Sequence, residues 1–264
     1  MIYDVRGLRF AYPNGHQVIN DATFTLDEGE VLTILGPNGA GKSTLFNCLA
    51  NIRRPTGGKI LLGGSPMDKL SVKEVAGLIG YVQQTHIAVF DYTVIYFVMM
   101  GRAARVGVFS RPKAEDRAIA MQALETLGIA HLAERPYTAI SGGERQLVLI
   151  ARALTQQPKA ILLDEPTSHL DFGRSTLILE LVRELQAKGY SVIMTTHDPN
   201  HAVLLGEKAA LLDRSGILRV GPAEEIVTEE NLRPLYKSEL HIVEIKSLSR
   251  RACLSAALRQ STGN

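Results

Sequence analysis

Short apolar runs separated by turn residues dominate the N-terminal part of the chain. Apolar and polar residues alternate around Val18–Ile19 and again at Phe24 and Leu26, which is typical of strands with one buried face. The run Val31–Leu35 is apolar at every position but Thr33, which is typical of a strand buried on both faces. We therefore expect several strands here, the last of which leads into a glycine-rich segment.

The pattern changes to helical spacing in the middle of the chain. Short strands are predicted over 59–62 and 79–82, and helices then extend over about 86–158. A break rich in Gly, Arg and Pro at 101–112 precedes a long helix at 114–127. Because strands are predicted before and after this stretch, we expect it to be a helical insertion.

Strands alternate with a helix in the C-terminal part. Apolar runs at 160–163 and 191–194 enclose a helical stretch at 174–188, which is the β-α-β order of a parallel sheet. A last strand pair is predicted over 209–220. The pattern as a whole predicts an α/β fold.

The composition is that of an ordinary globular chain. Its 264 residues carry 29 Lys and Arg against 27 Asp and Glu, with no polybasic stripe, so we expect no nucleic-acid partner. Cys48 and Cys253 suggest neither a zinc site nor a disulfide framework. No signal-peptide layout opens the chain, and the longest apolar stretch, Thr93–Met100, is far shorter than the roughly 20 residues that span a bilayer. We therefore expect a cytoplasmic protein that acts at a membrane only from outside it.

The segment Gly36–Ser43 matches the phosphate-loop pattern G-x-x-x-x-G-K-[ST] between a predicted strand and a helix. In such a loop the backbone N–H groups surround phosphate oxygens, Lys42 reaches the β- and γ-phosphates, and the Ser43 hydroxyl binds Mg²⁺. The residues expected to contact a nucleotide here are Gly36, Pro37, Asn38, Gly39, Ala40, Gly41, Lys42, Ser43 and Thr44. The alternative is a glycine-rich turn with a solvated lysine.

Two carboxylates follow the apolar run at 160–163. Asp164 is placed to bind Mg²⁺ directly or through water, and Glu165 suits a base or an orienting group for an attacking water. Alone, the pair could be plain surface carboxylates. Together with a phosphate loop, it indicates nucleotide hydrolysis.

The segment Ser141–Gln146 opens a helix with a capping box between Ser141 and Glu144. A cap does not need Gly142 and Gly143, each of which costs a helix about 1 kcal/mol relative to alanine. Glycines here let backbone N–H groups approach a ligand closely, and a second phosphate site is the natural candidate.

Together these motifs resemble the ATP-binding cassette (ABC) family, the nucleotide-binding subunits of ABC transporters. Ser141–Gln146 is similar to the signature motif of that family, with Ile140 where Leu is usual. The resemblance implies a phosphate-loop NTPase core with a parallel sheet, an N-terminal antiparallel β subdomain and an α-helical subdomain inserted at about 86–158. It implies one ATPase domain over 1–245 and leaves 246–264 as a tail of unknown role.

The family pattern also gives roles to scattered residues. Tyr12 resembles the aromatic residue that stacks on adenine, and Gln84 the Q-loop glutamine, with Gln83 as the alternative register. Asp171 resembles the D-loop aspartate and His197 the switch histidine. Without the pattern, Tyr12 would be a core residue, His197 a structural histidine and Gln84 an ordinary loop residue.

The resemblance implies ATP hydrolysis with Mg²⁺ at sites shared between two copies of the chain. The catalytic residues would be Glu165, His197 and Gln84, and those at the metal Ser43, Gln84 and Asp164. A second copy would supply Ser141, Gly142 and Gly143 to each ATP. The other implied partners are integral membrane permease subunits and, indirectly, a periplasmic or extracellular solute-binding protein. The chain would then be peripheral to the cytoplasmic side of the cell membrane.

Two further segments resemble one group of importers. Asp91–Val94 and Met100–Arg102 are similar to the importers of iron–siderophore, haem, cobalamin and related metal or oxyanion solutes. The alternative is that these residues only begin the helical insertion. We expect residues 86–112 to form part of the permease contact, so that single cysteines at Tyr92, Phe97 and Arg102 should crosslink to a permease.

Two other functions compete with transport. Cassette ATPases of DNA repair, chromosome organisation or translation carry a coiled-coil insertion, zinc-binding cysteines or two cassettes in one chain, and this sequence shows none of them. A nucleotide-binding regulator without turnover would not need both Glu165 and His197. ATP hydrolysis coupled to transport is therefore the favoured function.

Overall fold

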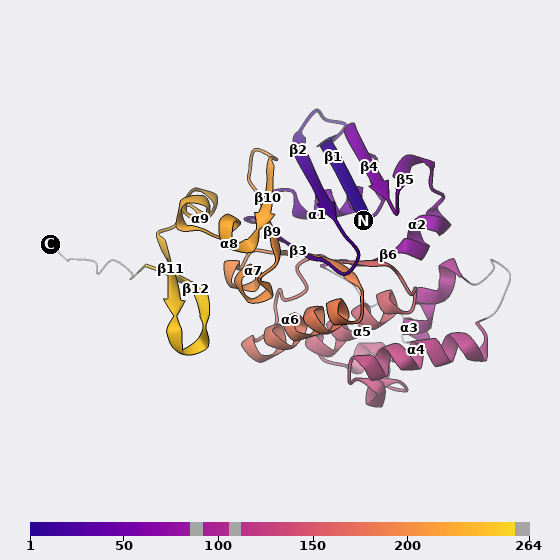
Figure 1. Ribbon diagram of the computed structural model, residues 1–264. Coiled ribbons are helices and arrows are strands. Elements are labelled where there is room, and N and C mark those ends of the chain that lie inside the picture. Colours follow the sequence, from indigo (N-terminus) through magenta and orange to yellow (C-terminus); the bar gives the residue numbers. More distant parts are fainter. Residues whose placement is uncertain (85–91, 106–111, 257–264) are drawn as a thin grey trace.

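The computed structural model describes residues 1–84, 92–105 and 112–256, so the expected helix start near His86 and the resemblance at Asp91 lie outside the described part. A central six-stranded sheet, in the order β10-β9-β3-β8-β7-β6, is the largest sheet of the molecule (Figure 1). Its strands are β3 (Val31–Leu35), β6 (Ile79–Val82), β7 (Ala160–Leu163), β8 (Ser191–Thr196), β9 (Lys208–Leu212) and β10 (Leu218–Pro222). All pairs in it are parallel except β9 with β10, which confirms the predicted parallel sheet and its closing strand pair.

The central sheet is buried on both faces, as its continuous apolar runs predict. In β7, Ile161 and Leu163 join the core cluster on the helical side, whereas Ala160 and Leu162 join the cluster on the opposite side. Because successive side chains of a strand point to opposite faces, a strand between two cores must be apolar at every position.

An antiparallel sheet of order β2-β1-β4-β5 covers one face of this core. Its strands are β1 (Tyr3–Ala11), β2 (Gln17–Leu26), β4 (Gly57–Leu62) and β5 (Ser65–Pro66). In the second half of β2, buried and exposed residues alternate, as the pattern at Phe24 and Leu26 predicts. The helix α1 (Lys42–Leu49) packs in the same core cluster.

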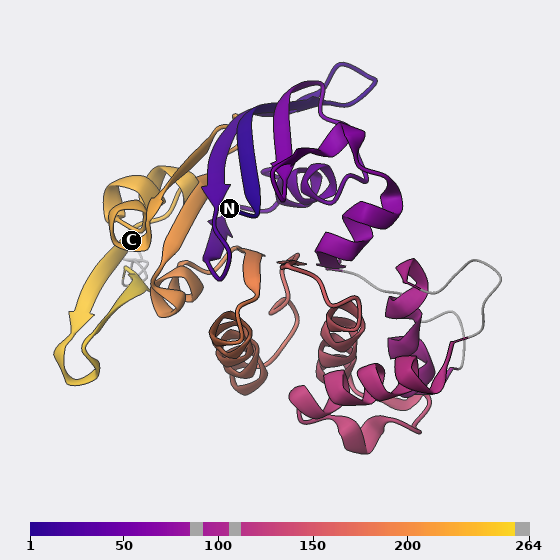
Figure 2. The same cartoon turned by 45° about the vertical axis from the view of Figure 1, so that its right-hand side comes forward.

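Most of the helices between β6 and β7 form a separate lobe away from the antiparallel sheet (Figure 2). The α-helices of the described chain before β8 are α1, α2 (Val72–Leu78), α3 (Val94–Met99), α4 (Ala114–Thr126), α5 (Gly142–Leu154) and α6 (Phe172–Ala187). Short 3₁₀ helices are η1 (Met67–Lys69), η2 (Met100–Ala104), η3 (Ala130–Leu132) and η4 (Tyr137–Ala139). The inserted helical subdomain is therefore present, as predicted.

Of the three positions expected at the permease contact, Tyr92 is 43% exposed, but Phe97 and Arg102 are buried. Phe97 stacks on Tyr137 with ring centres 4.2 Å apart and is only 6% exposed. Arg102 is 7% exposed, ion-pairs with Asp116 at 3.0 Å and donates to the backbone oxygen of Thr155 at 2.8 Å. These two positions are therefore not accessible to a partner, because Phe97 holds α3, and Arg102 holds η2, onto the rest of the helical lobe.

The C-terminal part contains elements that the sequence pattern did not predict. They are α7 (Pro199–Leu205), α8 (Ala223–Ile226), α9 (Glu229–Tyr236), β11 (Leu240–Ile245), η5 (Lys246–Leu248) and β12 (Arg250–Ser255). β11 and β12 form a hairpin, so the predicted division after residue 245 falls at its turn. The Asn200 side chain pairs with both backbone groups of Cys253 at 2.8 and 3.1 Å, which joins the hairpin to α7.

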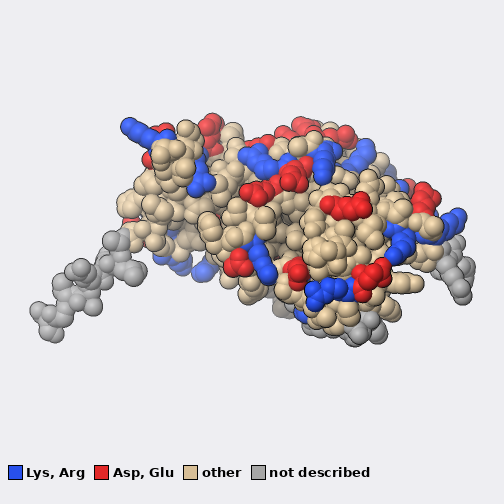
Figure 3. All heavy atoms as spheres, turned by 90° about the horizontal axis from the view of Figure 1, so that it is seen from below, with Lys and Arg blue, Asp and Glu red and all other residues tan. Residues whose placement is uncertain are grey.

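The surface seen from below carries charges of both signs, interspersed with uncharged residues (Figure 3). None of the helices in the described part of the chain has the length and apolar character that crossing a bilayer requires.

Candidate active site

The segment Gly36–Ser43 connects the end of β3 to the start of α1, as the motif predicts. At two positions of this loop, the geometry requires glycine. Gly41 has φ +99°, and an added Cβ would lie 2.5 Å from Cγ1 of Val18. A Cβ at Gly36 would lie 2.6 Å from the backbone oxygen of Leu212. The loop can follow its tight path only because these positions carry no side chain.

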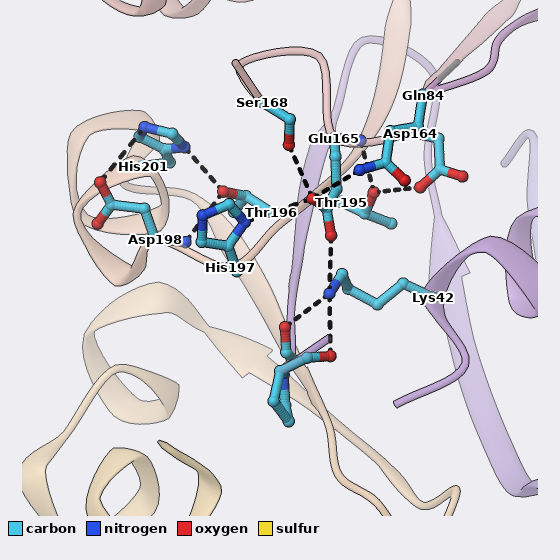
Figure 4. Close-up of polar contacts among 12 residues, drawn as sticks. Lys42, Gln84, Asp164, Glu165, Ser168, Thr195, Thr196, His197, Asp198 and His201 are labelled. Atoms are coloured by element: carbon cyan, nitrogen blue, oxygen red, sulfur yellow. Dashed lines mark hydrogen bonds and ion pairs between the residues drawn. The ribbon is translucent and has the colours of Figure 1, made fainter. Parts of the chain in front are cut away.

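Lys42 turns back across the loop and reaches Glu165, which follows β7 (Figure 4). Its Nζ donates to the backbone oxygens of Gly36 and Pro37 at 2.7 and 3.1 Å, and lies 2.9 Å from Oε1 of Glu165. Both charged side chains are more than nine-tenths buried. Since buried charges are costly unless paired, this contact ties the phosphate loop to the carboxylate that follows β7.

The second oxygen of Glu165 collects three more groups. Oε2 accepts from Ser168 Oγ at 2.8 Å and from Gln84 Nε2 at 3.3 Å, and lies 3.3 Å from Nδ1 of His197. Burial raises the pKa of Glu165, but the hydrogen bonds from Lys42 and Ser168 and the charges of Lys42 and His197 outweigh it, so the pKa is lowered overall. Glu165 is therefore a carboxylate at neutral pH and can accept a proton or orient water.

Thr195, near the end of β8, holds both Asp164 and Glu165 and was missed by the sequence analysis. Its hydroxyl donates to Oδ1 of Asp164 at 2.7 Å and accepts from the backbone N–H of Glu165 at 2.8 Å. This second bond helps to hold Glu165 at φ +46°, a strained value for a residue with a side chain. β7 and β8 are parallel neighbours, so their carboxyl ends share one edge, and that rule could have identified Thr195.

The turn that presents His197 is held by a small buried network. Thr196 Oγ1 accepts from the backbone N–H of Asp198 at 3.1 Å, so its own proton is available to Nδ1 of His201, 2.8 Å away. Burial lowers the pKa of His201, which favours this neutral acceptor form. Asp198 in turn caps α7 by accepting from the backbone N–H of Asn200. The sequence analysis did not single out His201 or Thr196.

A cavity of about 550 Å³ opens beside Lys42. It is lined by Tyr12, His16, Val18, Asn38, Gly39, Gly41, Lys42, Ser43, Thr44, Gln84 and Glu165. Gln84 lines it and Gln83 does not. Tyr12 packs edge-on against Phe10, lies under the Arg53 guanidinium at 5.0 Å, and has its hydroxyl 3.2 Å from Thr44 Oγ1. The stacking of Tyr12 on adenine stays a prediction.

The signature segment does not line this cavity. Ser141 and Glu144 form the predicted capping box, with Ser141 Oγ donating to Glu144 at 2.6 Å and accepting from its backbone N–H at 3.4 Å. Asp171 likewise caps α6 outside the cavity. Arg145 Nε and Gln146 Nε2 are buried without a hydrogen-bond partner in the described part of the chain. Both motifs are thus intact locally but lie apart from Lys42.

The oxygen donors near the phosphate loop fit a magnesium ion. Asp164 is nearly buried and its carboxylate is oriented by Thr195 and by the Tyr81 hydroxyl at 3.5 Å. Ser43 and Gln84 line the cavity. Among the residues that the structure describes, no three His, Cys, Asp or Glu side chains could hold a metal on their own. That suits Mg²⁺, which is usually bound by one or two protein oxygens together with nucleotide phosphates and water.

The arrangement matches known proteins. Residues 19–168 match the family model described as ABC transporter. The chain is 41% identical to the molybdate import ATP-binding protein MolC of Haemophilus influenzae, covering 88% of this chain and 87% of that protein. It is 35% identical to the iron(3+)-hydroxamate import ATP-binding protein FhuC of Bacillus subtilis, covering 90% and 89%.

A solved structure described as an inward-facing conformation of a putative metal-chelate type ABC transporter aligns with a TM-score of 0.86 at 36% identity, over 97% of this chain and 98% of that one. The resemblance to importer ATPases read from the motifs is thereby confirmed. The family model covers more than half of the chain, and the relatives above 30% identity are covered almost end to end. The chain therefore belongs to the ABC transporter family, as an ATP-binding subunit that couples ATP hydrolysis to transport.

Proposed function

We propose that two copies of this chain bind ATP with Mg²⁺ and, attached to a membrane permease on its cytoplasmic side, power the uptake of a metal chelate or a metal oxyanion. The observation that carries the proposal is the buried contact between Lys42 and Glu165. It brings a phosphate-binding cation and a water-orienting carboxylate together at the edge of one cavity. Hydrolysis requires both, whereas nucleotide binding alone requires only the first.

ATP binding would exchange the contact between Lys42 and Glu165 for contacts between Lys42 and the β- and γ-phosphates. Glu165 would still be held by Ser168 and His197, and its free oxygen would orient water in line with the γ-phosphate. Bound Mg²⁺ would supply neutralisation of the phosphate charge. Ser43, Asp164 and Gln84 would hold it.

A second copy would complete each site. The described lining of the cavity includes one cation, Lys42, besides the phosphate-loop amides. The signature segment carries free helix N–H groups at Gly142 and Gly143, outside the cavity of its own chain. In an arrangement of two facing copies, Ser141 to Gly143 of one would meet the γ-phosphate bound by the other.

The permease would dock in a groove of about 380 Å³ next to the site. The groove is lined by Ala50, Asn51, Ile52, Val72, Val75, Ala76, Ile79, Tyr81 and Gln156. Two apolar side chains of the groove, Ile52 and Val72, are 57% and 84% exposed. Exposed apolar side chains that gather in one place mark interaction sites. Tyr81 lines the groove and its hydroxyl lies 3.5 Å from Asp164, so a segment bound there could shift the site.

The expected class of solute follows from relatives whose names specify iron-hydroxamate and molybdate import. The test is to purify the chain with its permease and solute-binding protein, reconstitute them in vesicles, and measure ATPase activity with ferric hydroxamate, haem, cobalamin, molybdate or manganese. Stimulation by a metal chelate or oxyanion is the expected result. Stimulation only by a metal-free solute such as a sugar or an amino acid would contradict the proposal.

Docking is tested separately by single cysteines in a Cys48→Ser, Cys253→Ser background. Val72→Cys and Ile52→Cys should crosslink to the permease. The control is Leu177→Cys on α6, which is 55% exposed and does not line the groove. Equal crosslinking of all three positions would rule out the groove as the docking site.

A further inference from the structure

One side chain connects the signature segment to the D-loop. A Cβ added at Gly143 would lie 2.6 Å from Cδ and 2.6 Å from Nη1 of Arg174. Arg174 also contacts Asp171: its backbone N–H donates to Oδ1 at 2.9 Å, and its Nε lies 3.5 Å from Oδ2. Arg174 therefore bridges two motifs that stand about thirty residues apart in the sequence.

The neighbouring glycine has different surroundings. A Cβ added at Gly142 would meet no atom within 4 Å, whereas the space at Gly143 is already occupied by the Arg174 side chain. Gly143 is buried within its own chain. The two glycines of the signature thus differ in their surroundings: Gly142 faces open space, whereas Gly143 packs against the Arg174 guanidinium.

Stability does not explain why Arg174 lies there. The Arg174 side chain is 45% exposed and its carboxylate partner 65% exposed, and such ion pairs contribute little to stability. The charge of Arg174 nevertheless acts on the segment. Hydrogen bonds from Ser141 lower the pKa of Glu144, and the charges of Arg135 and Arg174 lower it further. The positive charge of the Arg174 guanidinium therefore acts on the first turn of α5, where Glu144 lies.

We propose that Arg174 is a positioning residue of the shared ATP site. It sets Gly143 relative to Asp171, so that the signature segment and the D-loop reach the ATP of a second copy as one unit, with a positive charge beside them. This inference rests on the two-copy arrangement proposed above. It assigns Arg174 a role toward a nucleotide that its own chain does not bind.

The test measures ATP-driven pairing in the Glu165→Gln background, where hydrolysis is slow. Arg174→Gln should raise the ATP concentration for half-maximal dimer formation about tenfold and leave the affinity of the monomer for a fluorescent ATP analogue unchanged. Arg174→Lys should recover part of the loss because it keeps the charge. The matched control is Arg183→Gln on the same helix, at the same 45% exposure and paired with Glu207, which should change nothing.

A double-mutant cycle isolates the contact itself. Gly143→Ala displaces the guanidinium, so Gly143→Ala with Arg174→Gln should be no worse than the larger single effect. Gly142→Ala has no contact with Arg174, so its effect should add to that of Arg174→Gln. Additive effects at Gly143 would overturn the inference, as would unchanged pairing in Arg174→Gln. If the Glu165→Gln parent itself fails to pair with ATP, the two-copy proposal fails first, and the inference with it.

Discussion

The edge of β7 and the start of α5 are both assigned to the same reaction, yet they are built in opposite ways. At the edge of β7, Lys42, Ser168 and His197 all contact the carboxylate of Glu165 within one chain. At the start of α5, the helix caps itself and its glycines lie outside the cavity. Among the residues that the structure describes, Arg145 Nε and Gln146 Nε2 have no hydrogen-bond partner although both atoms are buried.

The difference suggests that the two regions have different roles, one in chemistry and the other in assembly. Buried polar atoms without partners are rare in folded proteins, and these two belong to the motif that is proposed to need a second chain. The edge of β7 can be understood from one chain, whereas the start of α5 has no role at the cavity of its own chain and would act on a second copy in the proposed arrangement. Substitutions at the edge of β7 should therefore change the rate of hydrolysis, and substitutions at the start of α5 should change the pairing of two copies.

The largest effect should come from Glu165→Gln. Glutamine keeps the shape but cannot take a proton from water, so turnover should fall by about 10²- to 10⁴-fold. ATP binding should persist, because Lys42 loses a competing carboxylate. Steady-state ATPase assays measure the turnover, and equilibrium binding of labelled ATP measures the affinity. Normal turnover would remove Glu165 from the role assigned here.

Ser141→Arg should strongly lower ATPase activity while sparing the binding of ATP to the monomer. A bulky cation at the first residue of the signature should lower ATPase activity about 10²-fold and leave ATP affinity of the monomer unchanged. Loss of the cap also costs about 1 kcal/mol of stability. Ser71 forms the same capping box with Glu74 on α2, so Ser71→Arg controls for that cost.

Mixing the Ser141→Arg chain with a Lys42→Ala chain sharpens the result. Each mixed dimer keeps one shared site in which both motifs are intact. Partial recovery of activity supports the shared site, and no recovery is compatible with strict coupling of the two sites. Full activity of the pure Ser141→Arg protein would contradict it.

A smaller effect is expected at Thr195. Thr195→Val removes the hydroxyl that holds Asp164 and the backbone N–H of Glu165, leaving two buried polar groups without that partner. The free energy of unfolding should fall by about 1–3 kcal/mol, and turnover by roughly tenfold. Thr195→Ser keeps the hydroxyl and should retain most of the stability and most of the turnover. Equal stability and turnover in the valine and serine variants would show that these hydrogen bonds are dispensable.

The sequence predicted what is local and periodic. The phosphate loop, the capping box at Ser141 and the strand 160–163 depend on neighbouring residues and appear as expected. The burial of Phe97 and Arg102 was not predictable, because Tyr137 and Asp116 meet them only in the folded lobe. Arg174 was missed for the same reason, because it acts through a contact between distant elements, whereas Thr195 could have been found from its place at the end of a strand parallel to β7.

The smallest effect concerns the pH dependence of stability. The pKa of Glu165 is lowered in the fold, so the folded state favours the carboxylate more than the unfolded chain does. Its contribution to stability is therefore fully present above the ordinary glutamate pKa and is lost as the pH falls through the lowered value. Thermal or urea unfolding of the wild type and Glu165→Gln should give a constant difference above about pH 6 that shrinks in acid.

His197 also faces Glu165, and histidines change charge in part of this range, so both proteins are compared in a His197→Gln background. Lys42 remains as the ion-pair partner of Glu165 in this background. A stability difference that is the same at neutral and acidic pH would show that the Glu165 carboxylate is not stabilised by the fold. The two regions would then differ in their partners but not in their electrostatics, and the edge of β7 would have to be explained by packing alone.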